Sequence, residues 1–427
     1  YFSNDRTGNP KIKIMNAKKT LFYKKRFLIY GFGKSGHASY KFLSKKNECR
    51  IIDDKKKNIP LKYANKRINY NQITKNYFDF IVLSPGIDLN RCRLSKYLKK
   101  NISKIITDLD IFYLNFPKIK KITITGTNGK STTSKLLYDV LKKHGKDVRL
   151  SGNIGNPVLL EKDLRKKTIF VIEASSYQLE YSKYFRSDYS LILNLSPDHL
   201  ERHGSFQNYI NAKFKLIQNQ LKNNYAFIEN KNNLLVNLIK KNKIKAKIYK
   251  VDYKKYKKYY KLISNNNLKN QSNILNLSFI FAMSKCLKLN FKKIIKVANE
   301  FKGLKFRQQI VYKSNKLTII NDSKSTSLSS TLPLLSSLKN IYWILGGLAK
   351  KGDRLKLKKT NFKNIKAFIY GKDNLFFSKI LSKKIKYEIS KNLDKSLLLV
   401  FKELKKNKLE KKIILFSPSA ASFDQFS

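Results

Sequence analysis

The chain has 427 residues, enough for about three domains with buried cores. Hydrophobic residues make up 42% of it and aromatic residues 12%, which excludes an intrinsically disordered protein. The formal net charge of +63 ordinarily favours nucleic-acid or anionic-membrane binding. Lys, Asn, Ile, Phe and Tyr are all abundant, however, and the lysines occur in every segment. We therefore interpret most of the charge as compositional drift on a solvated surface, not as a dedicated polyanion site.

Cysteine usage and hydropathy point to the cytoplasm. Cys49, Cys92 and Cys286 are far apart in the sequence and form neither a disulfide framework nor a metal-binding spacing. No apolar run reaches the ~18 residues that span a bilayer, and the N-terminal stretch lacks the apolar core of a signal peptide. Residues 1–13 have no hydrophobic periodicity, and Met15 precedes the first clear strand. We expect residues 1–14 to be flanking sequence.

The first glycine cluster follows an apolar strand, Arg26–Tyr30, and reads Gly31-x-Gly33-x-x-Gly36. The next apolar strand ends at Asp53, about twenty residues later. This spacing is typical of a nucleotide-binding βαβ unit, in which Asp53 would hold a ribose or a base edge. Simple strand–helix packing explains the glycines equally well, so both interpretations stay open.

A third strand, Phe80–Leu83, runs into the turn Ser84-Pro85-Gly86. In open α/β sheets, ligands bind at the carboxyl ends of the strands. The turn is therefore expected at the ligand-binding edge of the first sheet.

The second glycine cluster lies between an alternating strand, Lys121–Thr125, and a helix expected to run through His144. Its end, Gly-Lys-Ser, is that of a phosphate-binding loop, with Lys130 placed for the β- and γ-phosphates and Ser131 for Mg²⁺. Ile124 stands where the general pattern has its first glycine, and a capped helix after a turn is the alternative. The candidate loop residues are Gly126, Thr127, Asn128, Gly129, Lys130, Ser131 and Thr132.

Two further candidates lie at strand ends. A buried strand ends at Glu173, whose carboxylate would suit Mg²⁺, although a solvated glutamate in a turn is the alternative. His199 follows the apolar stretch Leu191–Leu195. A zinc site is not expected there, because no second pair of soft ligands lies nearby.

Residues 240–261 alternate lysine with tyrosine and aliphatic residues. Such interleaving can bind single-stranded nucleic acid. We favour β-structure with a lysine-rich solvent face.

The loop Thr125–Thr132 resembles the ATP loop of Mur ligases and folylpolyglutamate synthases. Later motifs narrow the resemblance to the D-glutamate-adding Mur ligases, and it covers essentially the whole chain from about Met15. The motifs are, in order, Gly31–Gly36, Ser84–Ile87, Ser151–Gly155, Glu173–Glu180, Asp198–Gly204, Phe301–Leu304 with Arg307, Asn321–Thr326, Leu345–Gly347 and Ser417–Phe426.

The resemblance implies an α/β protein of three domains. Residues 15–109 would form an N-terminal Rossmann-like domain for the UDP substrate, and residues 110–303 a central parallel-sheet P-loop ATPase. Residues 304–427 would form a C-terminal Rossmann-like domain for D-glutamate.

The implied activity is ATP-dependent amide ligation in cytoplasmic peptidoglycan precursor synthesis. D-Glutamate would be added to UDP-N-acetylmuramoyl-L-alanine through an acyl phosphate, with two Mg²⁺ ions. A monomer with no membrane and no specific nucleic-acid partner is expected.

The resemblance also assigns roles to residues. For the UDP substrate they are Lys34, Ser35, Asp53, Ser84, Pro85, Gly86, Asn153 and Gln178. For ATP, beyond the loop, they are Asn276, Arg307 and Asp322. For D-glutamate they are Ser175, Lys324, Thr326, Lys350 (with Lys351 as a rival), Ser422 and Phe423. The metal ligands would be Ser131, Glu173, His199 and Lys213, the last as a carbamate. The catalytic set would be Lys130, Lys213, His199, Arg307 and Lys324.

The chain departs from the family pattern at several places. Asn270 and Ser272 replace a usual glycine and histidine, and Phe306 replaces a usual histidine beside Arg307. The family continues about twenty residues beyond Ser427, with a further aromatic substrate contact. We therefore expect this chain to be C-terminally incomplete.

Four rival functions stay open at this point. A nicotinamide-dependent oxidoreductase would explain the first glycine cluster but not the second. A nucleic-acid-binding protein that has lost catalysis would explain the charge. A ligase for another amino acid, or a folate-polyglutamylating enzyme, would share the ATP loop.

Overall fold

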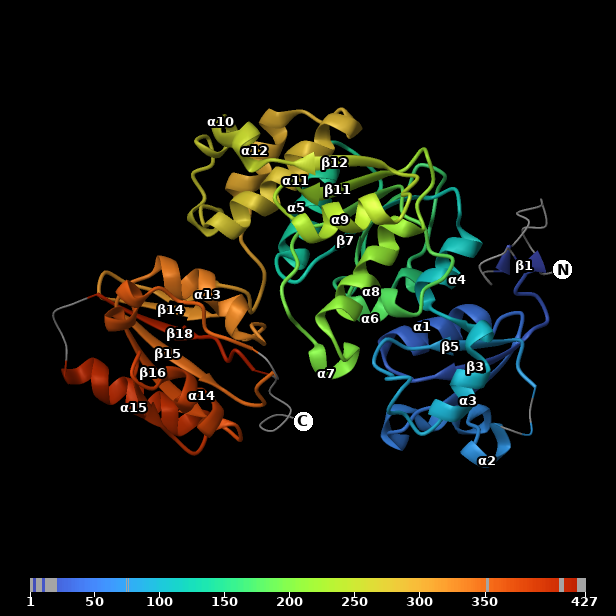
Figure 1. The fold of residues 1–427 in the computed structure, drawn as a ribbon, viewed down its shortest axis with the longest axis horizontal. Coiled ribbons are helices and arrows are strands. Elements are labelled where there is room, and N and C mark those ends of the chain that lie inside the picture. The colour runs from blue at the N-terminus through green and yellow to red at the C-terminus, as the bar shows by residue number, and fades with distance from the viewer. Residues whose placement is uncertain are drawn as a thin grey trace. The chain divides into compact units, whose positions relative to one another are not determined.

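The computed structural model describes residues 3–4, 10–11, 21–73, 75, 77–350, 353–406 and 411–420. They form an α/β protein that divides into two compact units (Figure 1). Unit 1 comprises residues 1–119, 151–166 and 175–186, and unit 2 the remainder. No helix in these ranges is both long and apolar enough to cross a bilayer. Among the expected residues, Met15, Lys351, Ser422 and Phe423 lie outside the described ranges.

Unit 1 is built on a parallel four-stranded sheet in the order β4-β3-β5-β6. The strands β3 and β5 are buried almost throughout, as expected for a parallel sheet covered on both faces. A separate antiparallel pair joins β1 to β2. The strands are β1 (Ser3–Asn4), β2 (Pro10–Lys11), β3 (Arg26–Tyr30), β4 (Glu48–Ile52), β5 (Phe80–Leu83) and β6 (Ile105–Ile106). The helices are α1 (Lys34–Leu43), α2 (Tyr70–Ile73), α3 (Ser95–Lys100), α4 (Asp108–Asn115) and α6 (Ser176–Glu180).

One buried carboxylate fastens residues 175–186 to the rest of unit 1. Asp110, in the first turn of α4, accepts a hydrogen bond from Ser182 Oγ at 2.8 Å. It also accepts backbone N–H groups of Tyr184 at 2.8 Å and Phe185 at 2.9 Å. Several donors on one buried carboxylate offset the cost of removing its charge from water.

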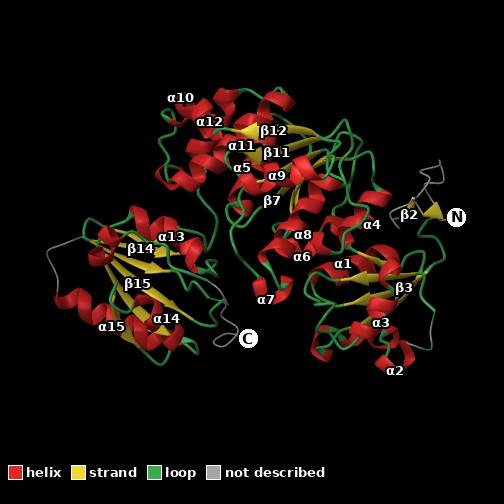
Figure 2. Ribbon diagram, in the orientation of Figure 1, coloured by secondary structure: helices red, strands yellow, loops and turns green. Residues whose placement is uncertain are grey.

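The first sheet of unit 2 has six strands in the order β12-β11-β10-β7-β9-β8 (Figure 2). The strand pairs β12–β11, β11–β10, β10–β7 and β7–β9 are all parallel. Its strands are β7 (Lys120–Thr125), β8 (Val148–Gly152), β9 (Ile169–Glu173), β10 (Tyr189–Ile192), β11 (Tyr225–Glu229) and β12 (Lys247–Val251). The helices of this part are α5 (Lys130–Lys143), α7 (Leu200–His203), α8 (Phe206–Gln218), α9 (Asn233–Lys241), α10 (Lys257–Tyr260), α11 (Gln271–Leu287) and α12 (Phe291–Glu300).

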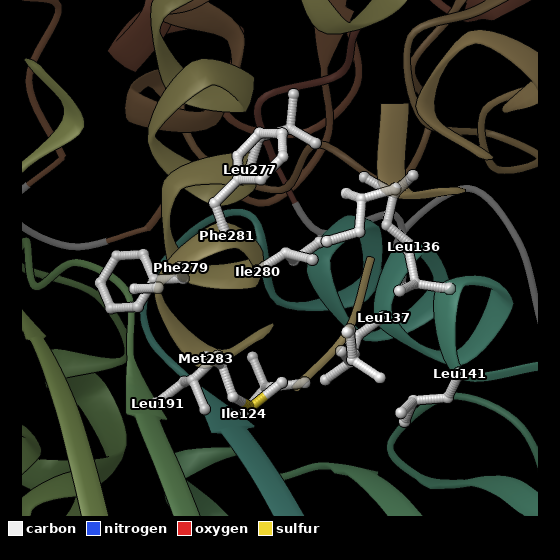
Figure 3. Packing of buried hydrophobic residues seen from close by; sticks show 14 of the residues in the cluster. Ile124, Leu136, Leu137, Leu141, Leu191, Leu277, Phe279, Ile280, Phe281 and Met283 are labelled. Carbon is white, nitrogen blue, oxygen red and sulfur yellow. The ribbon is translucent and has the colours of Figure 1, made fainter. Parts of the chain in front are cut away.

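The core of this sheet lies under α5 and α11. Leu136 and Leu137 of α5 and Ile280 and Met283 of α11 are at most 1% exposed and belong to one hydrophobic cluster with Ile124 of β7 (Figure 3). Packing two long helices on the central strand holds the β7–α5 connection on a rigid base.

The C-terminal sheet is mixed, in the order β13-β14-β18-β15-β16-β17. Only the edge strand β13 runs antiparallel, and a register shift occurs between Ile310 and Tyr312. Most of β13 is exposed. Its sequence therefore lacks the alternation of apolar and polar residues that predicts a half-buried strand. The strands are β13 (Gln309–Lys313), β14 (Leu317–Asn321), β15 (Ile341–Gly346), β16 (Ile365–Tyr370), β17 (Lys386–Ile389) and β18 (Lys412–Phe416), and the helices α13 (Leu328–Ser337), α14 (Asn374–Leu381) and α15 (Leu393–Lys406).

The expectation of β-structure over residues 240–261 is correct only in part. Strand β12 carries exposed lysines at the edge of its sheet, as expected for a protected sheet edge. Residues 240–241 are the end of helix α9, which Asn232 caps by accepting the backbone N–H of Leu235 at 3.2 Å. Residues 253–260 form short helical turns.

Candidate active site

The β7–α5 connection has the geometry of a phosphate-binding loop. Gly129 ends the loop with φ +82°, a left-handed conformation that favours glycine, and the helix α5 begins at Lys130. A Cβ at Gly129 would lie 2.3 Å from Asn276 Oδ1, so the loop also passes against α11. The free N–H groups of the first turn of α5 form an anion-binding helix terminus.

Lys130 folds back over this loop. Its Nζ donates to the backbone oxygens of Gly126 at 3.0 Å and Thr127 at 2.7 Å. Desolvation lowers the pKa of Lys130, and the carboxylates of Glu173 and Asp198 act in the opposite direction. The ammonium is thus held inside the loop where a phosphate chain would meet it.

Residues that follow β10 brace the loop. Asn194 accepts the N–H of Asn128 at 2.8 Å and donates to the oxygen of the same residue at 3.0 Å. Thr127 Oγ1 lies 3.0 Å from the Tyr209 hydroxyl and accepts the N–H of Ser196 at 3.0 Å. The loop is therefore held from two sides before any ligand binds, which reduces the ordering cost of binding.

Lys213, on α8, is 2% exposed and reaches the base of the same loop. Its Nζ donates to the oxygen of Gly126 at 2.9 Å and lies 3.3 Å from Thr125 Oγ1. The ammonium also lies 4.7 Å from the centre of the Tyr209 ring. Burial lowers the pKa of Lys213 well below its usual value, and the nearby Lys130 adds to this effect.

A group of charged residues adjoins the loop. Glu173, the last residue of β9, is fully buried. Asp198 Oδ1 lies 2.5 Å from Lys350 Nζ, and Asp198 Oδ2 lies 3.4 Å from His199 Nε2. Burial alone would raise the pKa of Asp198, but Lys350 and His199 hold it below its usual value. The other ring nitrogen of His199 lies 3.5 Å from Glu201.

Hard oxygen donors suited to Mg²⁺ are present at the loop. Ser131 lies in the first turn of α5. The charge of Glu173 acts to raise the pKa of both Lys130 and Lys213. Nowhere in the described ranges do three His, Cys, Asp or Glu side chains converge on one point. Mg²⁺ commonly takes only one or two protein carboxylates, with water and phosphate oxygens completing its octahedron, so this donor set fits it.

The C-terminal candidates occupy two environments. Arg307, Lys324 and Thr326 are exposed, whereas Asp322 is 5% exposed. Asp322 accepts the N–H of Gln308 at 3.0 Å and the Ser417 hydroxyl at 2.9 Å. Burial raises the pKa of Asp322 to about 6, although these two hydrogen bonds act to lower it.

In unit 1, contacts within the chain hold the first glycine loop in place. Ser84 Oγ donates to the oxygen of Gly31 at 2.6 Å, and a Cβ at Gly36 would lie 1.9 Å from that oxygen. Asp53 accepts the N–H groups of Phe32 at 2.6 Å and Lys55 at 2.9 Å. The carboxylate therefore sits against the loop, where it would meet hydroxyl or amide donors of a ligand.

The structure divides the candidate residues between the two units. Unit 1 holds every residue assigned to the UDP substrate, together with Ser175. There Gln178 Oε1 accepts the N–H of Ser175 at 3.0 Å in a capping box that starts α6. Lys34 and Asn153 are exposed. Unit 2 holds the candidate ATP loop, the metal candidates and all other described candidates.

Sequence reasoning missed the residues that brace the loop Gly126–Thr132. Asn194 follows β10 almost immediately, so its place at a carboxyl strand end could have identified it. Tyr209 gave no such signal, because an aromatic residue on a helix is usually part of a core, and it is indeed 1% exposed.

Comparison with known proteins decides the family. A model of the Mur ligase middle domain matches residues 124–340. The UDP-N-acetylmuramoylalanine--D-glutamate ligase of Rickettsia prowazekii (strain Madrid E) is 34% identical over 435 residues, covering 96% of both chains. The chain belongs to the Mur ligase family. The enzyme of the same name from Francisella tularensis subsp. novicida is 33% identical to this Mur ligase, over 94% of this chain and 92% of its own.

Solved structures agree on the fold of this Mur ligase. MurF from Acinetobacter baumannii gives a TM-score of 0.56 at 16% identity, covering 82% of this chain and 84% of its own. The UDP-N-acetylmuramate-alanine ligase MurC from Thermotoga maritima gives 0.54 at 16% identity, covering 93% and 96%. At this identity the likeness concerns architecture, and it confirms the expected three-domain α/β fold, whose central and C-terminal sheets both belong largely to unit 2. The domain boundaries and the individual site residues stay predictions.

Proposed function

We propose that this protein is the ATP-dependent ligase that joins D-glutamate to UDP-N-acetylmuramoyl-L-alanine in peptidoglycan precursor synthesis. The observation that carries the proposal is the buried, braced loop Gly126–Thr132 in a chain that matches D-glutamate ligases along 96% of its length. The oxidoreductase alternative leaves that loop unexplained. The lysines outside the Gly126–Thr132 loop are mostly exposed and are spread along the whole chain. Their distribution therefore gives no specific support to nucleic-acid binding.

The reaction must overcome the unfavourable condensation of a carboxylate with an amine in water. The terminal L-alanine carboxylate attacks the γ-phosphorus of ATP, the bond to the bridging oxygen of ADP breaks, and an acyl phosphate forms. The D-glutamate nitrogen then attacks the acyl carbon, phosphate leaves with the former carboxylate oxygen, and the amine loses a proton. Exclusion of water protects the acyl phosphate between the two steps.

The chain's own groups stabilise the charge that shifts during phosphoryl transfer. Lys130 already lies inside the loop, and the N–H groups at the start of α5 are preorganised toward an anion. We assign Arg307, which is exposed, to the transferring phosphoryl group. Fixed donors and cations of this kind need no reorganisation at the moment of reaction, which is the basis of their catalytic effect.

Magnesium completes the proposed site. Ser131 and Glu173 would hold one ion, and His199 and a carbamylated Lys213 a second. Bound Mg²⁺ supplies neutralisation of the phosphate oxygens and orients them.

The surroundings of Lys213 support its carbamylation. Only the neutral amine adds CO₂, forming an N–C bond and releasing one proton. Burial favours that neutral form by lowering the pKa of Lys213. The carbamate would place negative charge beside Lys130, whose ammonium offsets it.

Substrate binding is assigned by unit. The loop at Gly31, with Asp53 and Ser84, would hold the uridine part of the substrate, helped by Asn153 and Gln178. Lys324, Thr326 and Lys350 would meet D-glutamate and phosphate. We place the enzyme in the cytoplasm as a monomer.

The experiment that tests the proposal measures phosphate release from ATP with UDP-N-acetylmuramoyl-L-alanine and a panel of amino acids. Release that depends strictly on D-glutamate supports it. Equal or better release with L-lysine, meso-diaminopimelate or L-alanine would assign a different ligase reaction. Folate-dependent release with L-glutamate would assign the polyglutamylating alternative.

A further inference from the structure

Four hydroxyl side chains form a buried cluster under the carboxyl edge of the C-terminal sheet. They come from three separate segments: the turn after β14, helix α13 and the turn after β18. The members of this hydroxyl cluster are Ser325, Thr331, Ser417 and Ser419, which are 3%, 0%, 0% and 0% exposed. Buried polar groups are costly unless they are hydrogen-bonded, so hydroxyls buried together must hold one another in place.

Thr331 is the centre of the hydroxyl cluster. Its Oγ1 lies 2.8 Å from Ser325 Oγ, 2.7 Å from Ser417 Oγ and 2.6 Å from Ser419 Oγ. A hydroxyl offers one donor and two acceptor sites, so these three neighbours use its whole capacity.

The direction of the hydrogen bonds follows from Asp322. When its carboxylate is ionised it can only accept, so Ser417 donates to it at 2.9 Å. Ser417 must then accept the proton of Thr331. Ser325 and Ser419 lie next to the remaining acceptor sites of Thr331, and Ser325 also hydrogen-bonds to the Asp322 carboxylate. Asp322 also accepts the N–H of Gln308, next to Arg307 in the chain. One polarised chain thus links the Arg307 segment to both turns.

Ser325 lies between two exposed residues that are candidates for binding D-glutamate. Ser325 is buried, whereas its neighbours Lys324 and Thr326 are exposed. The backbone also connects the turn after β14 to the turn after β18, because Ser419 N donates to the oxygen of Ser325 at 2.9 Å. Fixing Ser325 therefore fixes the direction in which Lys324 and Thr326 leave the turn.

We infer that Thr331 is a positioning residue that sets the turn carrying Lys324 and Thr326 and so determines the affinity for D-glutamate. This inference rests on the proposed function. The hydroxyl acts through Ser325, not on the substrate, so its loss should affect one substrate selectively.

The test replaces Thr331 by valine, which keeps the shape and removes the hydroxyl. With saturating UDP substrate, Thr331→Val should raise the KM for D-glutamate about tenfold, as expected for lost positioning by a buried hydrogen-bond chain. The KM for ATP should rise less than the KM for D-glutamate, because the phosphate loop lies on another sheet and Asp322, which is assigned to ATP, keeps its hydrogen bonds from Gln308 and Ser417. Thr331→Ser keeps the hydroxyl and should restore the KM for D-glutamate, although it loses a methyl group.

The matched control is Thr318→Val, on strand β14 of the same sheet and 7% exposed, which should leave both KM values unchanged. If Thr331→Val does not fold, Ser325→Ala removes one arm of the cluster and should give the same selective rise. Unchanged KM values, equal rises for ATP and D-glutamate, or no rescue by serine would overturn the inference. Inactive wild-type protein would instead contradict the proposed function.

Discussion

The two glycine loops of this protein share a plan and differ in charge. Each follows a buried parallel strand and opens a helix, α1 in unit 1 and α5 in unit 2. In the first, the carboxylate of Asp53 accepts a loop N–H at 2.6 Å. In the second, the ammonium of Lys130 lies on the loop oxygens at 2.7–3.0 Å.

This difference shows that glycine spacing predicts a backbone shape and not a ligand. A carboxylate on the loop repels phosphate and favours hydroxyl and amide donors, as ribose and uracil provide. An ammonium at a helix N-terminus favours a triphosphate. The charge next to each loop therefore separates the UDP-substrate assignment from the ATP assignment, and the following variants probe that separation.

The largest effect is expected from Lys130→Ala. Removing the loop cation should lower ATP-dependent phosphate release by about a thousandfold or more, because a preorganised charge at the phosphoryl group is lost. Lys135→Ala is the control, since Lys135 lies on the same helix but pairs with Asp139 at 2.5 Å. Normal turnover in Lys130→Ala would show that the loop does not act on ATP.

Lys213→Ala should be nearly as severe. Loss of the proposed metal-binding carbamate should lower the rate by about a hundredfold, the usual scale for a disturbed metal site. Short carboxylic acids should restore part of the activity by entering the space left by the side chain. Lys215→Ala, two residues further along α8, serves as the control. An active Lys213→Ala protein would remove the carbamate from the mechanism.

Asp53→Ala tests the first loop. The KM for the UDP substrate should rise about tenfold, consistent with the loss of a charge-assisted hydrogen bond to a ribose or base. The KM for ATP should stay unchanged. Asp54→Asn is a close control, because Asp54 instead accepts the hydroxyls of Tyr30 and Tyr70 at 2.6 and 2.7 Å. If ATP were affected more than the UDP substrate, the roles of the two loops would need exchanging.

The smallest effect concerns pH and stability in unit 1. Burial raises the pKa of Asp108 from 3.8 to about 6. The folded state therefore binds this proton more readily than the unfolded state, and the group adds stability as the pH falls from about 6 to about 4. Asp108→Asn should remove about 1–3 kcal/mol of that pH dependence. Thermal unfolding of both proteins at several pH values measures it, and identical slopes would contradict the assignment.

Much of the fold could be predicted because parallel strands are buried on both faces. The strands β3 and β5 start and end where the apolar runs Arg26–Tyr30 and Phe80–Leu83 do. The helix α5 ends at Lys143, one residue before the expected His144. Short apolar runs followed by glycine loops leave little choice of structure.

Other features could not be predicted because they depend on tertiary contacts. Strand β13 is mostly exposed and exists only through pairing with β14. Thr331 is an ordinary helix residue in the sequence, and its role emerges only where three segments meet. Likewise, the low pKa of Lys213 comes from burial that the spacing of one lysine among many does not reveal.

The most direct test of the account follows oxygen atoms through the reaction. UDP-N-acetylmuramoyl-L-alanine labelled with ¹⁸O in its terminal carboxylate is incubated with ATP and D-glutamate, and the released phosphate is examined by ³¹P NMR. Activation of that carboxylate on the Gly126–Thr132 loop predicts one labelled oxygen in each phosphate formed. Amide product accompanied by unlabelled phosphate would contradict it.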